Sequence, residues 1–185
     1  MTVSTFVEHA ERQVAESPIL PGEEQANNLL QEARAHIYYW PKDFGGFDCN
    51  VTLRASEGCF QGHLRATSAK EFQFDWSEDT PEVLKKWSHS QVGEFLAHRE
   101  SPKANKMTSR TGVRFGDNCP VYGPQLIFEG DKMHSYYRVR DHRITQIYRA
   151  YAGQYFIINI DDHDQLDGRF AATVYQAFYW DAQTN

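Results

Sequence analysis

The stretch 47-FDCNVTLRASEGCFQGHLRATSAKEFQFDW-76 decides the fold of this chain. Within it, apolar and polar residues alternate over positions 47–53, again over 60–66, and once more over 72–76. A period of two is typical of strands that bury one face. The Glu57-Gly58 turn signal separates the first two runs, so the sequence predicts an antiparallel hairpin followed by a third strand.

Helices are predicted on both sides of this stretch. Apolar residues at helical spacing begin after Gly22 and end near Tyr39, because Trp40-Pro41 disfavours helical backbone angles. A second helix is expected from about Pro81 to His98, where a proline in the first turn follows an Asp-Thr cap signal. Four residues of this helix are spaced to share one side, which we expect to face the sheet: Leu84, Trp87, Gln91 and Phe95.

Strand patterns return in the last third of the chain. We expect strands over 113–115, 125–128, 135–140, 143–151, 154–160 and 169–180. Strands at roughly 10-residue spacing with tight turns are typical of a meandering antiparallel sheet. The predicted fold is therefore α+β, with one curved, mainly antiparallel sheet of eight or nine strands that forms a half-barrel or barrel covered by helices. We expect a helical N-terminal arm at 1–22 and a single α+β domain at 23–185.

The composition excludes several classes of protein. The 185 residues carry a formal net charge of −6, whereas nucleic-acid-binding domains are normally basic. No apolar run approaches the roughly 20 residues of a membrane span, and the N-terminus has no signal-peptide pattern. The three cysteines, an odd number without CxxC spacing, are expected to be reduced thiols. These features predict a cytoplasmic protein with no membrane span and no nucleic-acid partner.

No sequence motif assigns a reaction. The chain has no Walker loop, no G-x-G-x-x-G, no G-x-S-x-G and no HExxH, so we predict neither a cofactor nor a metal. The run Asp161-Asp162-His163-Asp164 contains metal-binding residue types, but adjacent residues on a turn rarely point at one centre. We therefore favour a plain loop between two strands, where Asp is common for turn chemistry alone.

Aromatic residues make up 14% of the chain and suggest a cavity. On a concave sheet covered by a helix, they would line an apolar space for a ligand, although filling of an ordinary core is an open alternative. The candidate apolar residues are Trp40, Phe74, Trp76 and Trp87. A cationic and aromatic patch that could hold a carboxylate or phosphate is expected if two strand faces converge; the alternative is a solvated sheet face. The candidate residues of this patch are His134, Tyr136, Arg138, Arg149 and Tyr151.

The order of several short motifs along the chain carries a family resemblance. The motifs are Glu32-Ala33-Arg34, Tyr38-Tyr39-Trp40, Phe44-Gly45-Gly46-Phe47 with Val51, Trp87, His98-Arg99, Tyr137-x-Val139, and Tyr175…Tyr179-x-Asp181 with Thr184. Together they resemble a mainly cyanobacterial family of unknown function, number 3386 in the domain-of-unknown-function series, over residues 28–185. The resemblance implies a soluble protein of phototrophs and carries over no catalytic residue. Its pattern of elements is similar to the half-barrel of lipoprotein carriers, which concerns the fold alone.

Three functional hypotheses follow. The first is a cytosolic binding protein or chaperone for an apolar or amphipathic small molecule such as a lipid, carotenoid or tetrapyrrole. The second is a cofactor-independent lyase, isomerase or cyclase, in which His134 or His163 with Tyr and Asp moves protons in an apolar cavity. The third is an interaction module without a ligand. Under any of them, the N-terminal arm is a candidate surface for a protein partner.

Overall fold

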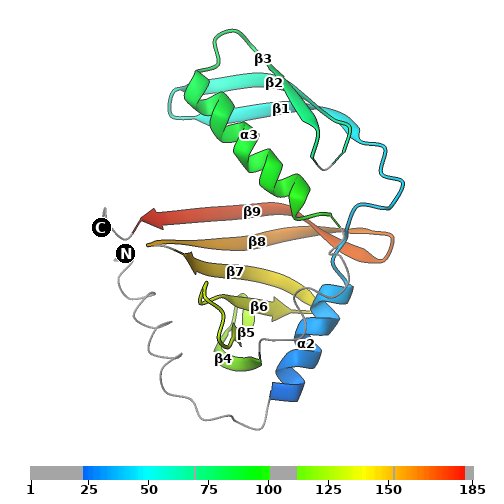
Figure 1. Ribbon diagram of the computed structural model, residues 1–185, viewed down its shortest axis with the longest axis vertical. Coiled ribbons are helices and arrows are strands. Elements are labelled where there is room, and N and C mark those ends of the chain that lie inside the picture. The colour runs from blue at the N-terminus through cyan, green and yellow to red at the C-terminus, as the bar shows by residue number, and fades with distance from the viewer. Residues whose placement is uncertain (1–22, 69, 101–111, 152, 182–185) are drawn as a thin grey trace. The chain divides into compact units, whose positions relative to one another are not determined.

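The computed structural model describes residues 23–68, 70–100, 112–151 and 153–181, which contain two helices and nine strands (Figure 1). These residues belong to two compact units. The three-stranded unit comprises Tyr39–Ala104, and the six-stranded unit combines the described parts of Met1–Tyr38 and Asn105–Asn185. The three-stranded unit is thus inserted into the sequence of the other, and each unit is described by itself below.

The three-stranded unit is a helix on an antiparallel sheet. Its elements are β1 (Phe47–Ala55), β2 (Gly58–Ala66), β3 (Phe72–Trp76) and α3 (Glu82–Ala97). The strands pair in the order β1-β2-β3, and α3 runs across one face of this sheet (Figure 1). The alternating sequence is the cause of this arrangement, because it gives β1 and β3 one partly buried and one exposed face.

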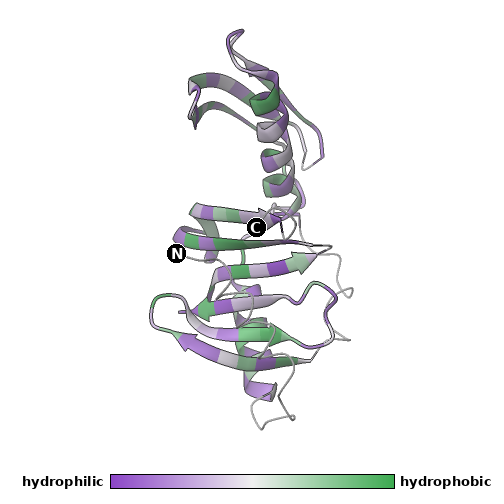
Figure 2. Ribbon diagram, turned by 90° about the vertical axis from the view of Figure 1, so that its left-hand side faces the viewer, coloured by the Kyte–Doolittle hydropathy of each residue, from purple (hydrophilic) through white to green (hydrophobic). Residues whose placement is uncertain are grey.

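The six-stranded unit is also antiparallel, with the strands in sequence order from β4 to β9. Its elements are α2 (Glu23–Ala35), β4 (Val113–Cys119), β5 (Gly123–Phe128), β6 (Tyr136–Arg140), β7 (Arg143–Tyr151), β8 (Gln154–Leu166) and β9 (Arg169–Asp181). Hydrophobic and hydrophilic stretches both occur along these strands (Figure 2), and most positions of the central strands β5 and β6 are buried.

One of the two buried apolar clusters among the described residues of the six-stranded unit lies between α2 and one face of its sheet. Ala26, Leu30 and Ala33 recur at helical spacing and are at most 1% exposed. They belong to one apolar cluster with Leu126 and Val139 of the central strands, which are 0% and 1% exposed. The sequence prediction that α2 is amphipathic is confirmed.

Tight turns set the register of two hairpins in this unit. Asp141 and His142 between β6 and β7 both have positive φ, at 51° and 60°. Asp167 and Gly168 between β8 and β9 likewise have φ of 50° and 75°. Two successive residues with positive φ are typical of the two-residue turns that match the twist of a hairpin. A tight turn between the strands expected over 135–140 and 143–151 is confirmed.

The segment after α2 is tied to the start of β9. The Tyr38 amide donates a hydrogen bond of 2.9 Å to the Phe170 carbonyl, and the Phe170 amide donates one of 2.6 Å to the His36 carbonyl. Ile37 and Phe170 thereby form a parallel bridge between opposite ends of the sequence. This bridge makes both ends of the described chain part of one unit.

The α+β class and the nine strands agree with the prediction, but a single curved sheet is wrong. The strands form two sheets of three and six strands, and neither is closed or strongly curled, so there is no half-barrel or barrel among the described residues. The physical reason is that α3 follows β3 along the chain, and β3 and β4 do not pair. A six-stranded sheet is also narrow enough to remain open.

Two further expectations concern the acidic run and the cysteines. The run Asp161–Asp164 is not a loop, because it lies within β8, where the register shifts between Ile160 and His163. The bulge accommodates polar residues at exposed strand positions, and the chain turns only at Asp167. The three cysteines are free, as expected. The predicted arm at 1–22 lies outside the described residues, and the single domain at 23–185 stays a prediction.

Candidate functional site

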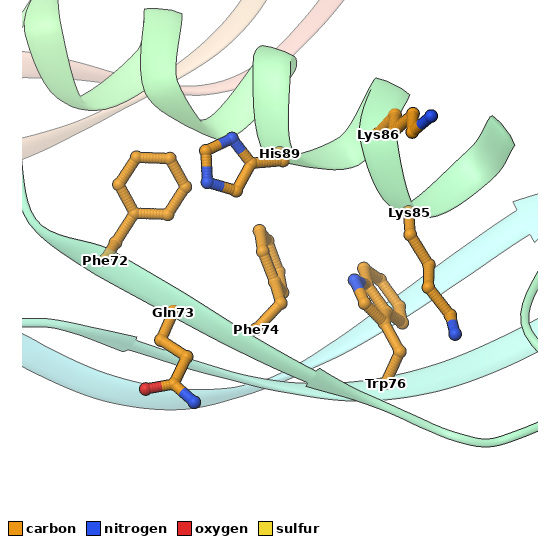
Figure 3. A pocket seen from close by; sticks show the side chains of 7 residues that line it. All are labelled: Phe72, Gln73, Phe74, Trp76, Lys85, Lys86 and His89. Carbon is orange, nitrogen blue, oxygen red and sulfur yellow. The ribbon is translucent and has the colours of Figure 1, made fainter. Parts of the chain in front are cut away.

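A groove between β3 and α3 is the candidate site of the three-stranded unit (Figure 3). Its volume is about 470 Å³, which is within the range of small-molecule sites. We call it the aromatic groove, and its lining residues are Phe72, Gln73, Phe74, Trp76, Lys85, Lys86 and His89.

Three aromatic side chains of β3 form one wall of the aromatic groove. Phe72, Phe74 and Trp76 occupy alternate positions of the strand, so they project from the same face towards α3 (Figure 3). The Phe74 and Trp76 rings are stacked with centroids 5.0 Å apart, and Phe72 meets Phe74 edge-on at 6.2 Å. All three residues are only partly buried, which leaves apolar ring surface for a ligand to cover.

A glycine on the neighbouring strand makes room for the indole ring. Gly62 of β2 is the register partner of Trp76. A Cβ atom at Gly62 would lie 2.5 Å from an indole ring carbon of Trp76, closer than two carbon atoms can approach without displacement. The position of the Trp76 ring against the sheet therefore depends on the absence of a side chain at Gly62.

The opposite wall is polar and basic. Lys85, Lys86 and His89 come from α3, and none of the lining residues is acidic. The His89 ring lies over Phe72, with centroids 4.4 Å apart and a tilt of 30°. Lys85 Nζ lies 2.9 Å from Glu82 Oε1 one turn earlier on the helix, and this hydrogen bond lowers the pKa of the Glu82 carboxyl.

The indole nitrogen of Trp76 is an unpaired buried donor. Among the residues that the structure describes, Trp76 Nε1 is shielded from solvent and has no hydrogen-bond acceptor. The nitrogen lies on the side of the ring that faces α3 (Figure 3). Native proteins satisfy most buried donors, so each exception calls for an explanation.

Trp40 belongs to a neighbouring aromatic cluster of the same unit rather than to the aromatic groove. Its ring is stacked on Phe44 at 4.3 Å and contacts Phe47 at 6.1 Å and Phe95 at 6.5 Å. Its Nε1 donates a hydrogen bond of 3.2 Å to the carbonyl oxygen of Leu96. These contacts fasten the end of α3 to the chain before β1.

The expectation that Trp87 faces the sheet is wrong. Its side chain is 52% exposed, and it does not line the aromatic groove. The buried positions of α3 are Ser88 and Leu96, so the covered stripe of the helix passes beside Trp87. Residue spacing along a helix shows which side chains share a side, but it does not show which side meets the sheet. The prediction chose the side that contains Trp87, whereas the sheet covers the side next to it.

The other face of the three-stranded sheet is a polar ladder. Asp48 of β1 pairs with both His63 and Arg65 of β2, and His63 also contacts the Asn50 side chain. The hydrogen bond from Arg65 is the main cause that lowers the pKa of Asp48. Since these groups are exposed and satisfy one another, this face is a solvated sheet surface.

The predicted cationic patch of the six-stranded unit does not converge on one face. Tyr136 is the register partner of Tyr148, which places both on one face of the sheet. Arg149 follows Tyr148 and therefore projects from the other face, where its Nη2 donates a hydrogen bond of 2.9 Å to the Tyr137 hydroxyl. Tyr151 shares the side of Arg149 along β7 and is 66% exposed.

The Arg138 side chain is buried and forms hydrogen bonds to other residues of the six-stranded unit. Its Nη2 donates hydrogen bonds of 2.8 and 3.0 Å to the Asp117 carboxylate, and its Nε donates one of 3.1 Å to Gln146. Its Nη1 contacts the carbonyl oxygens of Asp117 and Gly123. The side chain is 8% exposed, so Arg138 ties β4 and β5 to β6 and β7.

The two remaining predicted residues differ in burial. Tyr136 is 5% exposed and stacks on Tyr148 at 4.8 Å, and its burial raises the pKa of the hydroxyl to about 12. His134 is an exposed turn residue with a φ of 45°. Of the nine predicted site residues, the structure brings only Phe74 and Trp76 together in the aromatic groove.

Sequence reasoning missed the helical half of the groove. Lys85 and His89 are four residues apart, a spacing that places them on one face of a helix. The missing information was which face of α3 meets β3. The alternation in β3 places Phe72 on the inward face, but only its contact with His89 makes it a site residue.

The described residues contain neither a membrane-spanning helix nor a cluster of metal-binding side chains. No helix among them is long and apolar enough to cross a membrane. Within the same ranges, no group of three or more His, Cys, Asp or Glu residues is arranged to hold a metal ion.

Comparison with known proteins identifies the family of this chain. The sequence matches no curated protein and no solved structure. The model of the family described as "Protein of unknown function (DUF3386)" matches residues 22–185. This match confirms the resemblance drawn from the sequence motifs, and the chain belongs to the DUF3386 family.

Proposed function

We propose that the protein is a binding protein or chaperone for an apolar or amphipathic small molecule, held in the aromatic groove. The observation that carries the proposal is the row of partly buried rings of Phe72, Phe74 and Trp76 beside a polar helix face. Lipids, carotenoids and tetrapyrroles have a large apolar body, and many of them also carry a polar group, which matches the two kinds of lining.

Burial of ring surface supplies the driving force for such binding. Each square ångström of apolar surface removed from water contributes about 25 cal/mol. Ligand sites are typically apolar with a few polar groups that fix orientation, and the aromatic groove has this composition. Because the Trp76 ring already lies in place against Gly62, the ligand does not have to order it.

No observation favours the alternative of a proton-transfer enzyme. His63 is paired with Asp48, but on the polar face of the sheet, away from the aromatic groove. His89 lines the groove without an acidic lining residue. The enzyme hypothesis, the cytoplasmic location and a protein partner of the N-terminal arm stay predictions.

Native mass spectrometry of the protein purified from its own source tests the proposal directly. We expect a population with an additional non-covalent mass. Titrations with retinol, palmitic acid and protoporphyrin IX, followed by tryptophan fluorescence, complement this measurement. A protein that arrives empty and binds none of these probes contradicts the proposal.

A pair of glycine variants locates the binding to the groove. Gly62→Ala displaces the Trp76 ring and should weaken binding of the active probe about tenfold, the equivalent of a modest shape mismatch. Gly45→Ala is the matched control, since no atom lies within 4 Å of the position that its methyl carbon would occupy. Equal affinities of both variants would place the ligand elsewhere.

A further inference from the structure

The two edge strands of the six-stranded sheet differ in how they are protected. An edge strand presents backbone groups to a further strand, and proteins normally guard such edges with charged residues, prolines or bulges. The edge strand β4 has two of these features, because Arg114 and Asp117 lie within it and its register with β5 shifts after Phe115. The opposite edge strand is β9, which lies beside β8 (Figure 1).

The strand β9 lacks these protections over most of its length. The run 170-FAATVYQAFYW-180 contains no charged residue, glycine or proline, and the charges of the strand are confined to its ends, Arg169 and Asp181. The other edge strands, β1, β3 and β4, all contain charged residues in their interior. Pairing with β8 is also uninterrupted from Tyr175 to Asp181. The second half of β9 is thus a regular, uncharged edge.

The middle of β9 exposes apolar side chains on both faces of the sheet. Val174 and Phe178 are 51% and 43% exposed and share one face with Gln176, whereas Tyr175 is 42% exposed and projects from the other face. Within the described residues, no hydrogen bond from outside the β8–β9 hairpin reaches positions 173–178. This stretch therefore offers both a backbone edge and apolar surface to another strand.

The sequence of this stretch is complementary to itself. In an antiparallel pair of two β9 strands centred on Gln176, this glutamine lies opposite its own copy, Val174 lies opposite Phe178, and Tyr175 lies opposite Ala177. Residues directly opposite one another project from the same face and pack together. The exposed apolar residues would thus meet apolar partners. No like charges would oppose one another there, although each copy carries a formal net charge of −6.

We propose that the protein forms a two-fold symmetric dimer through β9, in which two six-stranded sheets join into one continuous antiparallel sheet with Gln176 at the symmetry axis. A two-fold contact uses the same surface of both copies, so it consumes both β9 edges at once. The β4 edges that remain at the outer ends carry charges and a register shift, which stops further growth. The inference is independent of the proposed function.

Sedimentation velocity of the full chain over a range of concentrations tests the dimer. We expect a reversible equilibrium between one and two copies, with no larger species. A protein that remains a monomer at every concentration overturns the proposal, and this outcome includes the cases in which another segment of the chain or a different protein covers β9. Growth into large assemblies overturns it as well, because the two-fold contact is closed.

A charge exchange at Gln176 tests the register. Gln176→Glu and Gln176→Lys each place two like charges opposite one another in the dimer, and each should raise the dissociation constant at least about tenfold. An equimolar mixture of the two variants should dimerise again, because a carboxylate then lies opposite an ammonium group. Recovery in the mixture also shows that both variants are folded.

Gln165→Glu and Gln165→Lys are the matched controls, since Gln165 is an exposed glutamine of β8, a strand that already has two neighbours. Both controls should retain the dissociation constant of the unmodified protein. Three results overturn the proposed pairing: Gln176 variants that dimerise normally, a mixture that stays monomeric, and Gln165 variants that lose the dimer equally.

Discussion

Both units place one helix on one antiparallel sheet, yet they bury their apolar residues to different degrees. In the six-stranded unit, α2 and the central strands exclude water almost completely, and Leu30 and Leu126 are 1% and 0% exposed. In the three-stranded unit, α3 buries only Ser88 and Leu96, and the inward residues of β3 are partly exposed. The same architecture thus produces a sealed core in one unit and an accessible aromatic face in the other.

The difference arises from the residues at the helix surface. The inward stripe of α2 consists of small and aliphatic residues such as Ala26 and Ala33, which allow close approach to the sheet. In α3, the positions over β3 are occupied by Lys85 and His89, whose polar groups remain at the groove. A helix with such residues covers a sheet without sealing it, which is what a binding surface requires.

Truncation of one side chain in each unit should give the largest contrast. Leu126→Ala should reduce the free energy of unfolding by about 2–5 kcal/mol through lost burial and the cavity left behind. Phe74→Ala should cost about half as much, because its ring is already partly solvated. Urea denaturation followed by circular dichroism measures both losses. Equal losses would mean that the two units are packed alike.

Removal of an acidic partner gives the next contrast. Asp117→Ala leaves the buried Arg138 guanidinium without its carboxylate and should destabilise the protein by about 2–3 kcal/mol. Glu100→Ala removes the partner of Lys70 in an exposed pair of the three-stranded unit and should cost less than about 1 kcal/mol. Chemical denaturation at low and high salt distinguishes them, and a small effect of Asp117→Ala would show that Arg138 is held by its neutral partners alone.

The smallest effect is expected at the exposed tryptophan of α3. Trp87→Ala should change the free energy of unfolding by less than about 1 kcal/mol, because the side chain is 52% exposed. Leu96→Ala, on the same helix and 0% exposed, should cost about 2–5 kcal/mol and serves as the reference. A loss of similar size at Trp87 would place that side chain in a packed environment.

Local sequence patterns predict most of the elements, although β8 continues through Asp161–Asp164, which the sequence favoured as a loop. The alternation over 47–76 predicts β1, β2 and β3 because the side-chain period of a strand is a local property. The spacing of Ala26, Leu30 and Ala33 predicts α2 in the same way. Family membership is also visible, since it depends on the order of motifs along the chain.

Properties that depend on pairing between distant segments could not be predicted. The sequence does not show that β3 and β4 belong to different sheets, because both begin with the same alternation. The pairing of Tyr136 with Tyr148 and of Arg138 with Gln146 decides that Arg149 lies on the opposite face from Arg138. The α3 residues that line the groove could not be predicted either, because tertiary packing decides which side of α3 faces β3.

The parallel bridge between Ile37 and Phe170 has a consequence for the order of events during synthesis. The helix α2 leaves the ribosome early, but its packing partners in β4, β6 and β7 follow only after the whole three-stranded unit has been made. Segments that depend on such distant partners acquire structure late, because the intervening chain must first be closed into a loop. We therefore expect β1, β2 and β3 to gain hydrogen-exchange protection before α2 when the denatured protein is refolded, so that the three-stranded unit matures ahead of the unit whose sequence surrounds it.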